Sequence, residues 1–328
     1  MRVSLKHLIV PSIPLAVLLI GCCYVFWGVD YFFPLQTHSN TIYNPIAERV
    51  QNLFLENPLL INFLSGLITL MNAFLLVQLN NRFALIRTRT FLPVIIYLFL
   101  IGIWEKTHLN ISSHLALTIF ILGLFNFFSM SHNKNATELA FMGSFFVALA
   151  GLIVFPYLFL IPVCWIGFMM LRSFSLRTFL ASLFGSLAPW VIFLSYLYFI
   201  HKLNILWTVF SGFNLSFSLQ SLSLIELIYT GLMLIILIIA IVGIFSNSNQ
   251  ASIQTRNKLN FLLWLIAATL FVAIFSIDQL SMFLPLLALI YALLVSHPFT
   301  LIKNKIYSTL FLVFVVLNIS FVIIKHIF

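Results

Sequence analysis

Charged residues are scarce in this chain. Asp, Glu, Lys and Arg together make up 7% of its 328 residues, whereas hydrophobic residues make up 62%. A soluble globular domain carries about 25% charged residues and about 45–50% apolar ones. So few polar groups cannot cover the outside of a soluble protein with this much apolar surface. The composition therefore excludes a soluble fold and predicts a protein whose main solvent is lipid.

Cysteine is also scarce, and its positions exclude two kinds of site. The three cysteines, Cys22, Cys23 and Cys164, all lie in apolar segments and form no CxxC or Cys/His pattern. Neither a disulfide framework nor a zinc site is predicted from them. The chain also lacks GxGxxG, P-loop, HExxH and GxSxG motifs, so nucleotide chemistry of the soluble type and protease chemistry have no support.

Long apolar runs dominate what is present. A helix needs about 20 apolar residues to cross a bilayer, and only a backbone that satisfies its own hydrogen bonds is tolerated there. The sequence therefore predicts an all-α, polytopic transmembrane helix bundle, a single integral membrane domain over residues 1–328. About 11 spans are expected, at about 8–28, 58–80, 91–104, 111–130, 138–154, 156–171, 178–200, 223–245, 261–277, 280–297 and 306–327.

Three of these spans are short, namely 91–104, 138–154 and 156–171, and the sequence leaves open whether each crosses fully. Pro156 lies in the break between the last two. A proline near a helix start ends one helix and begins the next. The pair is therefore expected to be either a tight helical hairpin or a re-entrant pair.

The distribution of Lys and Arg predicts the orientation. The net charge is +9, but the 16 Lys and Arg residues are scattered between apolar runs, which is typical of topology-setting loops and not of a nucleic-acid-binding surface. With a cytoplasmic N-terminus, twelve of the 16 fall on the cytoplasmic side and four on the outer side. Residues 29–57 then form an outer loop with an interfacial amphipathic helix, and residues 246–260 form a cytoplasmic linker.

Six of the seven acidic residues fall at or near the predicted outer face. Acids carry little topological weight, so this asymmetry indicates that the outer face handles cations, metal or protons. Asp30 follows the first span, and Glu105 follows the third. Both are candidate catalytic acids, because multi-span transferases of lipid-linked sugars place a carboxylate in an outer loop as general base or metal ligand. The alternative is that both are solvated residues at helix ends.

Basic residues and histidine supply the candidate binding groups. Lys106 and His108 follow Glu105 and are candidates for a phosphate on a substrate. On the cytoplasmic side, Arg82, Arg87 and Arg89 are candidates for an anionic lipid or a nucleotide-sugar phosphate, or they serve only as topology determinants. No metal site is assigned, although the transferase hypothesis allows a divalent metal.

The central stretch carries a resemblance to a known group of proteins. Residues 135–157 and 171–190 contain Gly143, Gly151, Pro156 and a turn with the residues Leu171-Arg172-Ser173-Phe174-Ser175-Leu176-Arg177, followed by Pro189. This stretch resembles an uncharacterised family of polytopic inner-membrane proteins of Bacteroidota, in which Pro stands where this chain has Ser173. The resemblance implies a bacterial inner-membrane location and no established activity.

The same residues also have an architectural interpretation. Gly143 and Gly151 allow close helix contact, Arg172 and Arg177 anchor the cytoplasmic turn, and Pro189 bends the following helix.

Three functions are open from the sequence. The first is a transferase, similar to glycosyltransferase C enzymes by architecture only, that acts on a polyprenyl-phosphate-linked or lipid-linked substrate at the outer leaflet. The second is a non-catalytic membrane subunit that holds protein partners of an envelope assembly. The third is a transporter or flippase for an amphipathic solute, which predicts broken helices near the midplane. In all three the bilayer is the main partner, and the long outer loop with its acids favours the first.

Overall fold

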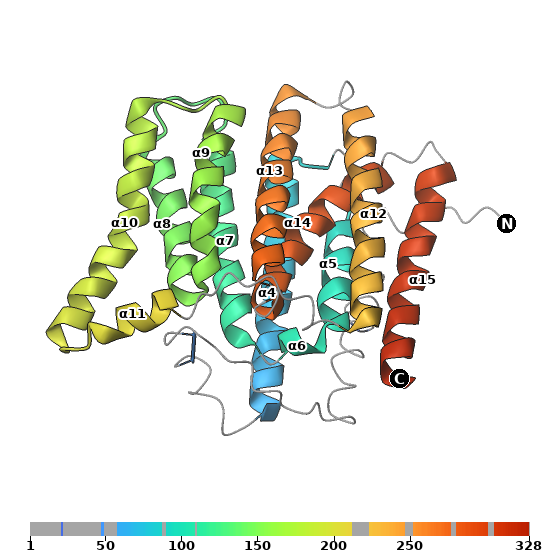
Figure 1. The fold of residues 1–328 in the computed structure, drawn as a ribbon. Helices are drawn as coiled ribbons and strands as arrows, with labels where there is room; N and C mark the ends of the chain where they lie inside the picture. Colours follow the sequence, from blue (N-terminus) through green and yellow to red (C-terminus); the bar gives the residue numbers. More distant parts are fainter. Residues whose placement is uncertain are drawn as a thin grey trace.

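The computed structural model describes residues 21, 47–48, 58–86, 90–108, 110–211, 223–246, 252–276, 280–300 and 305–327. All the elements in these ranges are helices (Figure 1). They are α4 (Pro58–Phe83), α5 (Leu92–Ile103), α6 (Glu105–His108), α7 (Ile111–Ser129), α8 (Thr137–Ile153), the 3₁₀ helix η1 (Phe155–Leu160), α9 (Ile161–Met170), α10 (Leu176–Phe199), α11 (Asn204–Ser211), α12 (Leu224–Ser246), α13 (Ile253–Phe275), α14 (Leu280–Thr300) and α15 (Lys305–Ile327).

Six helices are long and apolar enough to cross a membrane, namely α4, α7, α10, α12, α13 and α14. The prediction of an all-helical fold is therefore confirmed for the described residues, and the six apolar helices are consistent with a multi-pass membrane protein. Four shorter apolar helices, at 92–103, 137–153, 155–170 and 309–324, coincide with further predicted spans. The predicted span at 8–28 and most of the predicted amphipathic helix lie outside the described residues. The count of eleven and the cytoplasmic N-terminus stay predictions.

The short span at 91–104 is too short to cross by itself. Its helix, α5, has 12 residues, which rise about 18 Å along the axis, whereas the hydrocarbon core is about 30 Å thick. The predicted break at Pro156 is confirmed, because α8 ends at Ile153 and Pro156 stands in the first turn of η1. A Cβ added to Gly151 would lie only 2.6 Å from the Leu158 side chain. The absence of a side chain at Gly151 therefore allows η1 to pack closely against α8.

The helix α14 forms the middle of the bundle and α10 forms one margin. The apolar stretch of α14 is 83% buried, and that of α10 only 22%. Both α12 and α13 pack along α14, as does α5, while α8 joins α7 to α10. Figure 1 shows α10 and α15 on opposite sides of this arrangement. The core between them is made mainly of Leu, Ile, Val and Phe side chains, together with Ala, Tyr and Met.

One end of the bundle gathers turns that lie far apart in the sequence. The Thr255 hydroxyl donates to the carbonyl of Ala84 (3.3 Å), and the His132 amide donates to the carbonyl of Leu171 (3.0 Å). The Phe83 and Phe128 rings are 5.5 Å apart, which joins the two pairs. We call this the Arg82 end. Its turns are those for which the Lys and Arg pattern predicts a cytoplasmic position.

The turn at 171–177 is anchored by hydroxyl groups. Ser175 caps α10 by accepting from the Thr178 amide (3.2 Å), and its hydroxyl donates to the carbonyl of Lys134 (3.0 Å). The Thr178 hydroxyl donates to the carbonyl of Ser173 (3.2 Å). The side chains of Arg172 and Arg177 are exposed, and their expected role as anchors of this turn stays a prediction.

The glycine and proline predictions of the same stretch fall on helix contacts. Gly143 lies against the Phe127 ring, where a Cβ would approach to 2.4 Å. Pro189 is buried inside α10.

Helix α13 begins at Ile253, eight residues before the predicted span, because Ser252 caps it by accepting from the Thr255 amide (3.2 Å). The second half of the expected linker at 246–260 is therefore helical.

Candidate functional site

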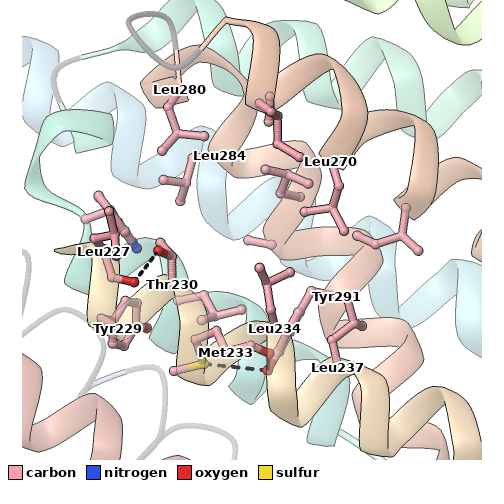
Figure 2. Close-up of a pocket in the computed structure, with 17 residues that line it drawn as sticks. Leu227, Tyr229, Thr230, Met233, Leu234, Leu237, Leu270, Leu280, Leu284 and Tyr291 are labelled. Atoms are coloured by element: carbon pink, nitrogen blue, oxygen red, sulfur yellow. Dashed lines mark hydrogen bonds between the residues drawn. The ribbon is translucent and has the colours of Figure 1, made fainter. Parts of the chain in front are cut away.

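An apolar pocket of about 300 Å³ lies between α12, α13, α14 and the end of α5. Leucine side chains from all four helices line it, with Met233, Tyr229 and Tyr291 (Figure 2). Its volume is at the lower end of the range for small-molecule sites, about 300–1,000 Å³. The pocket lies beside the predicted outer end of these helices, because Leu227 and Leu280 stand at the starts of α12 and α14 and Ile274 near the end of α13.

The pocket opens sideways, toward the hydrocarbon of the bilayer. Leu234 of α12 is 42% exposed and Ile274 of α13 is 48% exposed, although both line the pocket. Helices α12 and α13 each pack along α14 and hardly touch each other. A hydrocarbon chain can therefore enter between α12 and α13 without passing through water.

The polar groups around the pocket are already engaged. The Tyr229 hydroxyl donates to the Asn318 side chain of α15 (2.9 Å), and the Tyr291 hydroxyl donates to the carbonyl of Met233 (3.3 Å). The Thr230 hydroxyl donates to the carbonyl of Leu227 (2.9 Å), as Figure 2 shows. The pocket consequently offers hydrocarbon contacts and almost no free hydrogen-bonding group, which suits an apolar chain.

Two acidic residues adjoin the pocket in the sequence. Trp104 lines the pocket and directly precedes Glu105, with which α6 begins. Glu226 directly precedes Leu227, and its buried carboxylate accepts from the Ser223 amide (3.1 Å) at the start of α12. Ser223 in turn accepts from the Glu226 amide (3.2 Å), so these two residues form a capping box. We call this end of the bundle, with Trp104 and α6, the α6 end.

The predicted site residues divide between the two ends. The side chains of Glu105 and Lys106, and the whole of Asp30, Arg87 and Arg89, lie outside the described parts. His108 is fully buried, and its Nε2 lies 3.0 Å from the carbonyl of Ile101. The Ser65 hydroxyl of α4 donates to the carbonyl of His108, so His108 lies beside the start of α4. Arg82 is exposed near the end of the same helix, 17 residues further on. A helix rises about 26 Å over 17 residues, so Arg82 and His108 belong to different sites.

A buried polar cluster joins α4 to α7 beside the α6 end. His114 Nδ1 lies 3.1 Å from the Thr69 hydroxyl, and His114 Nε2 lies 3.1 Å from the carbonyl of Thr107. The Asn72 amide donates to the carbonyl of His114 (3.0 Å), and its oxygen accepts from the Thr118 hydroxyl (2.7 Å). Ser65, Thr69 and Asn72 follow one another at intervals of four and three residues, which places them on one helix face. That spacing is the signal by which the sequence could have revealed them.

The cluster explains why His114 is tolerated inside an apolar helix. Both ring nitrogens and the backbone carbonyl have partners, and each bond joins two helices. Bonds of this kind between helices stabilise membrane proteins by about 0.6 kcal/mol on average. Within the described residues, no three His, Cys, Asp or Glu side chains come together in a way that could hold a metal ion.

Comparisons with protein-family models, with curated proteins and with solved structures give no match to this chain. The resemblance of the central stretch to a Bacteroidota membrane family therefore stays a prediction. The geometry of the chain itself has to carry any assignment of function.

Proposed function

We propose that this protein binds the hydrocarbon chain of a lipid or polyprenyl-linked substrate in the pocket between α12, α13 and α14. The observation that carries the proposal is the combination of an apolar lining with an opening on the lipid-facing side. Burial of apolar surface stabilises a bound chain by about 25 cal/mol per Å² when the chain comes from water. A chain that comes from the bilayer gains less, so selectivity would depend on the group attached to it.

The position of the pocket suggests where that group lies. Trp104 closes the pocket at the α6 end, and tryptophan is enriched at the level of the lipid headgroups. Glu105 follows at the next position, in a predicted outer segment on the same side of the membrane as the loop that carries Asp30. We propose that the protein is a membrane enzyme of the lipid-linked sugar transferase type, acting at the outer leaflet of a bacterial inner membrane, with Glu105 and Asp30 as general base or as ligands of a divalent metal.

A second candidate function is the membrane subunit of an envelope assembly. The observation that favours it is the sparse packing of α10, on which Phe184, Ile192 and Phe199 are all exposed. Lipid covers such a face in a lone bundle, and a helix of a protein partner would cover it in an assembly. The two functions differ in what they expect of the pocket, because only the first requires it to be filled.

Lipid binding can be tested with a substitution that fills the pocket. Ala273 of α13 lines the pocket and is buried, whereas Ala267 lies on the same helix and is exposed. We expect Ala273→Phe to lower cross-linking of a diazirine-bearing polyprenyl phosphate to the purified protein in nanodiscs by about tenfold or more, because even one methylene that does not fit an apolar pocket changes binding by about tenfold. Ala267→Phe adds the same ring outside the pocket and is expected to leave cross-linking unchanged. Equal cross-linking in both variants and the wild type would contradict the proposed pocket.

The transferase proposal needs a separate test. Deletion cells complemented with Glu105→Gln or Asp30→Asn would be compared with wild-type cells by mass spectrometry of envelope glycans and lipid-linked intermediates. A missing sugar together with accumulated lipid-linked donor is the expected result. Unchanged glycans and lipids in cells whose protein still cross-links the polyprenyl probe would remove the transferase and leave the lipid pocket, and the membrane-subunit function would then be pursued.

A further inference from the structure

A group of cationic side chains surrounds Phe83 at the Arg82 end, where α4 ends and α13 begins. The Lys258 ammonium lies 5.0 Å from the centre of the Phe83 ring and 3.5 Å from the carbonyl oxygen of the same residue. The Arg82 guanidinium lies 5.5 Å from the centre of this ring. Two cations from helices that are about 175 residues apart in the sequence thus share one aromatic ring. Each interaction of this kind is worth about 0.5–2 kcal/mol.

The position of the Phe83 ring is fixed by its contacts with two rings of α7. Phe83 is buried, and its ring contacts the rings of Phe125 and Phe128 of α7, with centroids 5.8 and 5.5 Å away. The Thr255 hydroxyl donates to the carbonyl of Ala84 (3.3 Å) and holds the start of α13 against the end of α4. The positions of the cations are therefore set by packing between three helices.

The two sequence segments that meet at this junction contain cations and no acids. Residues 80–90 and 246–260 contain Arg82, Arg87, Arg89, Arg256 and Lys258 and no Asp or Glu. Lys258 is only 6% exposed, although its side chain is ionisable and lies in a membrane helix. A cation held out of water is costly unless an anion or dipoles compensate it. Within the described residues, one carbonyl oxygen and one aromatic face lie against the Lys258 ammonium group, and neither of them carries a negative charge.

We propose that this junction binds the phosphate of an anionic membrane phospholipid between the Lys258 and Arg82 side chains. The junction lies where two membrane-crossing helices end, and this is the level at which lipid phosphates lie. Basic pockets between membrane helices on the cytoplasmic side are known to take such headgroups. The site is distinct from the pocket at the α6 end, and it stands or falls independently of the proposed function.

The test compares two double variants of equal charge. Arg82→Gln with Lys258→Gln removes two cations from the junction. Lys134→Gln with Arg177→Gln removes two exposed cations from the same end of the bundle, on other turns. Binding of phosphatidylglycerol to the full-length protein would be measured by native mass spectrometry from phosphatidylcholine nanodiscs doped with phosphatidylglycerol. About fivefold weaker binding is expected for each junction charge removed, hence about twenty-five-fold for the pair.

The control pair is expected to change this affinity by less than about twofold, because exposed charges act only through a screened field. The conservative pair Arg82→Lys with Lys258→Arg keeps both charges and is expected to retain binding, which separates loss of the site from loss of the fold. Equal weakening in the two Gln pairs would overturn the proposal, since it would reduce the effect to overall surface charge. Tight binding of inorganic phosphate or a nucleotide diphosphate in pure phosphatidylcholine nanodiscs would overturn the assignment to a lipid.

Discussion

The contact between α8 and α10 depends on Gly185, and replacement of this residue by alanine tests the packing directly. Gly185 is buried in α10. A Cβ on it would lie 2.3 Å from the carbonyl oxygen of Phe141 in α8, and 3.0 Å from the carbonyl carbon and the Cα of that residue. All three obstructing atoms belong to the backbone. They cannot move away as the end of a side chain would, so the two helices have to separate by about 1 Å to restore an ordinary van der Waals contact of about 3.5 Å.

The expected cost follows from two opposing effects. Overpacking that shifts the backbone costs about 1–3 kcal/mol, and the upper value applies where no side chain can yield. Alanine is the better helix former by about 1 kcal/mol. Gly185→Ala should therefore destabilise the folded protein by about 2 kcal/mol. At Gly231 of α12 no atom lies within 4 Å of the added Cβ, so Gly231→Ala retains only the propensity term and should stabilise the protein by up to about 1 kcal/mol.

The free energy of unfolding of the two variants and the wild type would be measured in the same detergent, by steric trapping or by titration with dodecyl sulfate. The expected order of stability is Gly231→Ala, wild type, Gly185→Ala. A Gly185→Ala protein that is as stable as the wild type would refute the close approach of α8 and α10. Equal destabilisation at both positions would show that the loss of stability does not come from the contact between α8 and α10.

Two further predictions concern the buried polar cluster and the topology. His114→Phe removes the hydrogen bonds of both ring nitrogens and leaves the carbonyl of Thr107 without this partner. The substitution should lower the free energy of unfolding by about 1–3 kcal/mol. An unchanged free energy of unfolding in the same titration would contradict the cluster. Lys134→Cys and Lys202→Cys place a thiol on exposed residues near opposite ends of α10. Lys134 lies in the turn before α8, where its carbonyl accepts from the Ser175 hydroxyl at the start of α10, and Lys202 follows the end of α10. In a background without the native cysteines, an impermeant maleimide applied to intact cells should label the second and spare the first, and labelling of both or of neither would refute the predicted orientation of this helix.

The helices could be predicted from the sequence because lipid imposes a simple rule on it. An apolar run long enough to cross the hydrocarbon must be helical, and this rule placed α4, α7 and α12 within a few residues. The helix boundary at Pro156 could also be predicted, since proline lacks the amide that a continuing helix needs. The start of α13 could not be predicted, because Arg256 and Lys258 look like loop residues when only hydropathy is considered. In the structure they extend the helix past its apolar part.

The sites were harder to predict from the sequence, because they arise from contacts between distant segments. The pocket has no motif: it is made of leucines that any membrane helix would carry, and only the packing of α12 and α13 along α14 turns them into a lining. The pairing of Lys258 with Phe83 likewise joins two segments that no periodicity connects. The candidate acids stay predictions, since Asp30 and the Glu105 side chain lie outside the described parts.

The position of Lys258 cannot be explained by topology alone. A residue that only sets the orientation of a helix has to carry its charge on the cytoplasmic side, and it does so at least cost when water surrounds it. Arg177 fits that description, since its side chain is exposed in the first turn of α10. Lys258 differs, because its side chain is buried against Phe83 and the end of α4. Desolvation opposes this arrangement, so something must compensate it. The carbonyl of Phe83 and the face of its ring compensate in part, and a phosphate held jointly with Arg82 would complete the compensation.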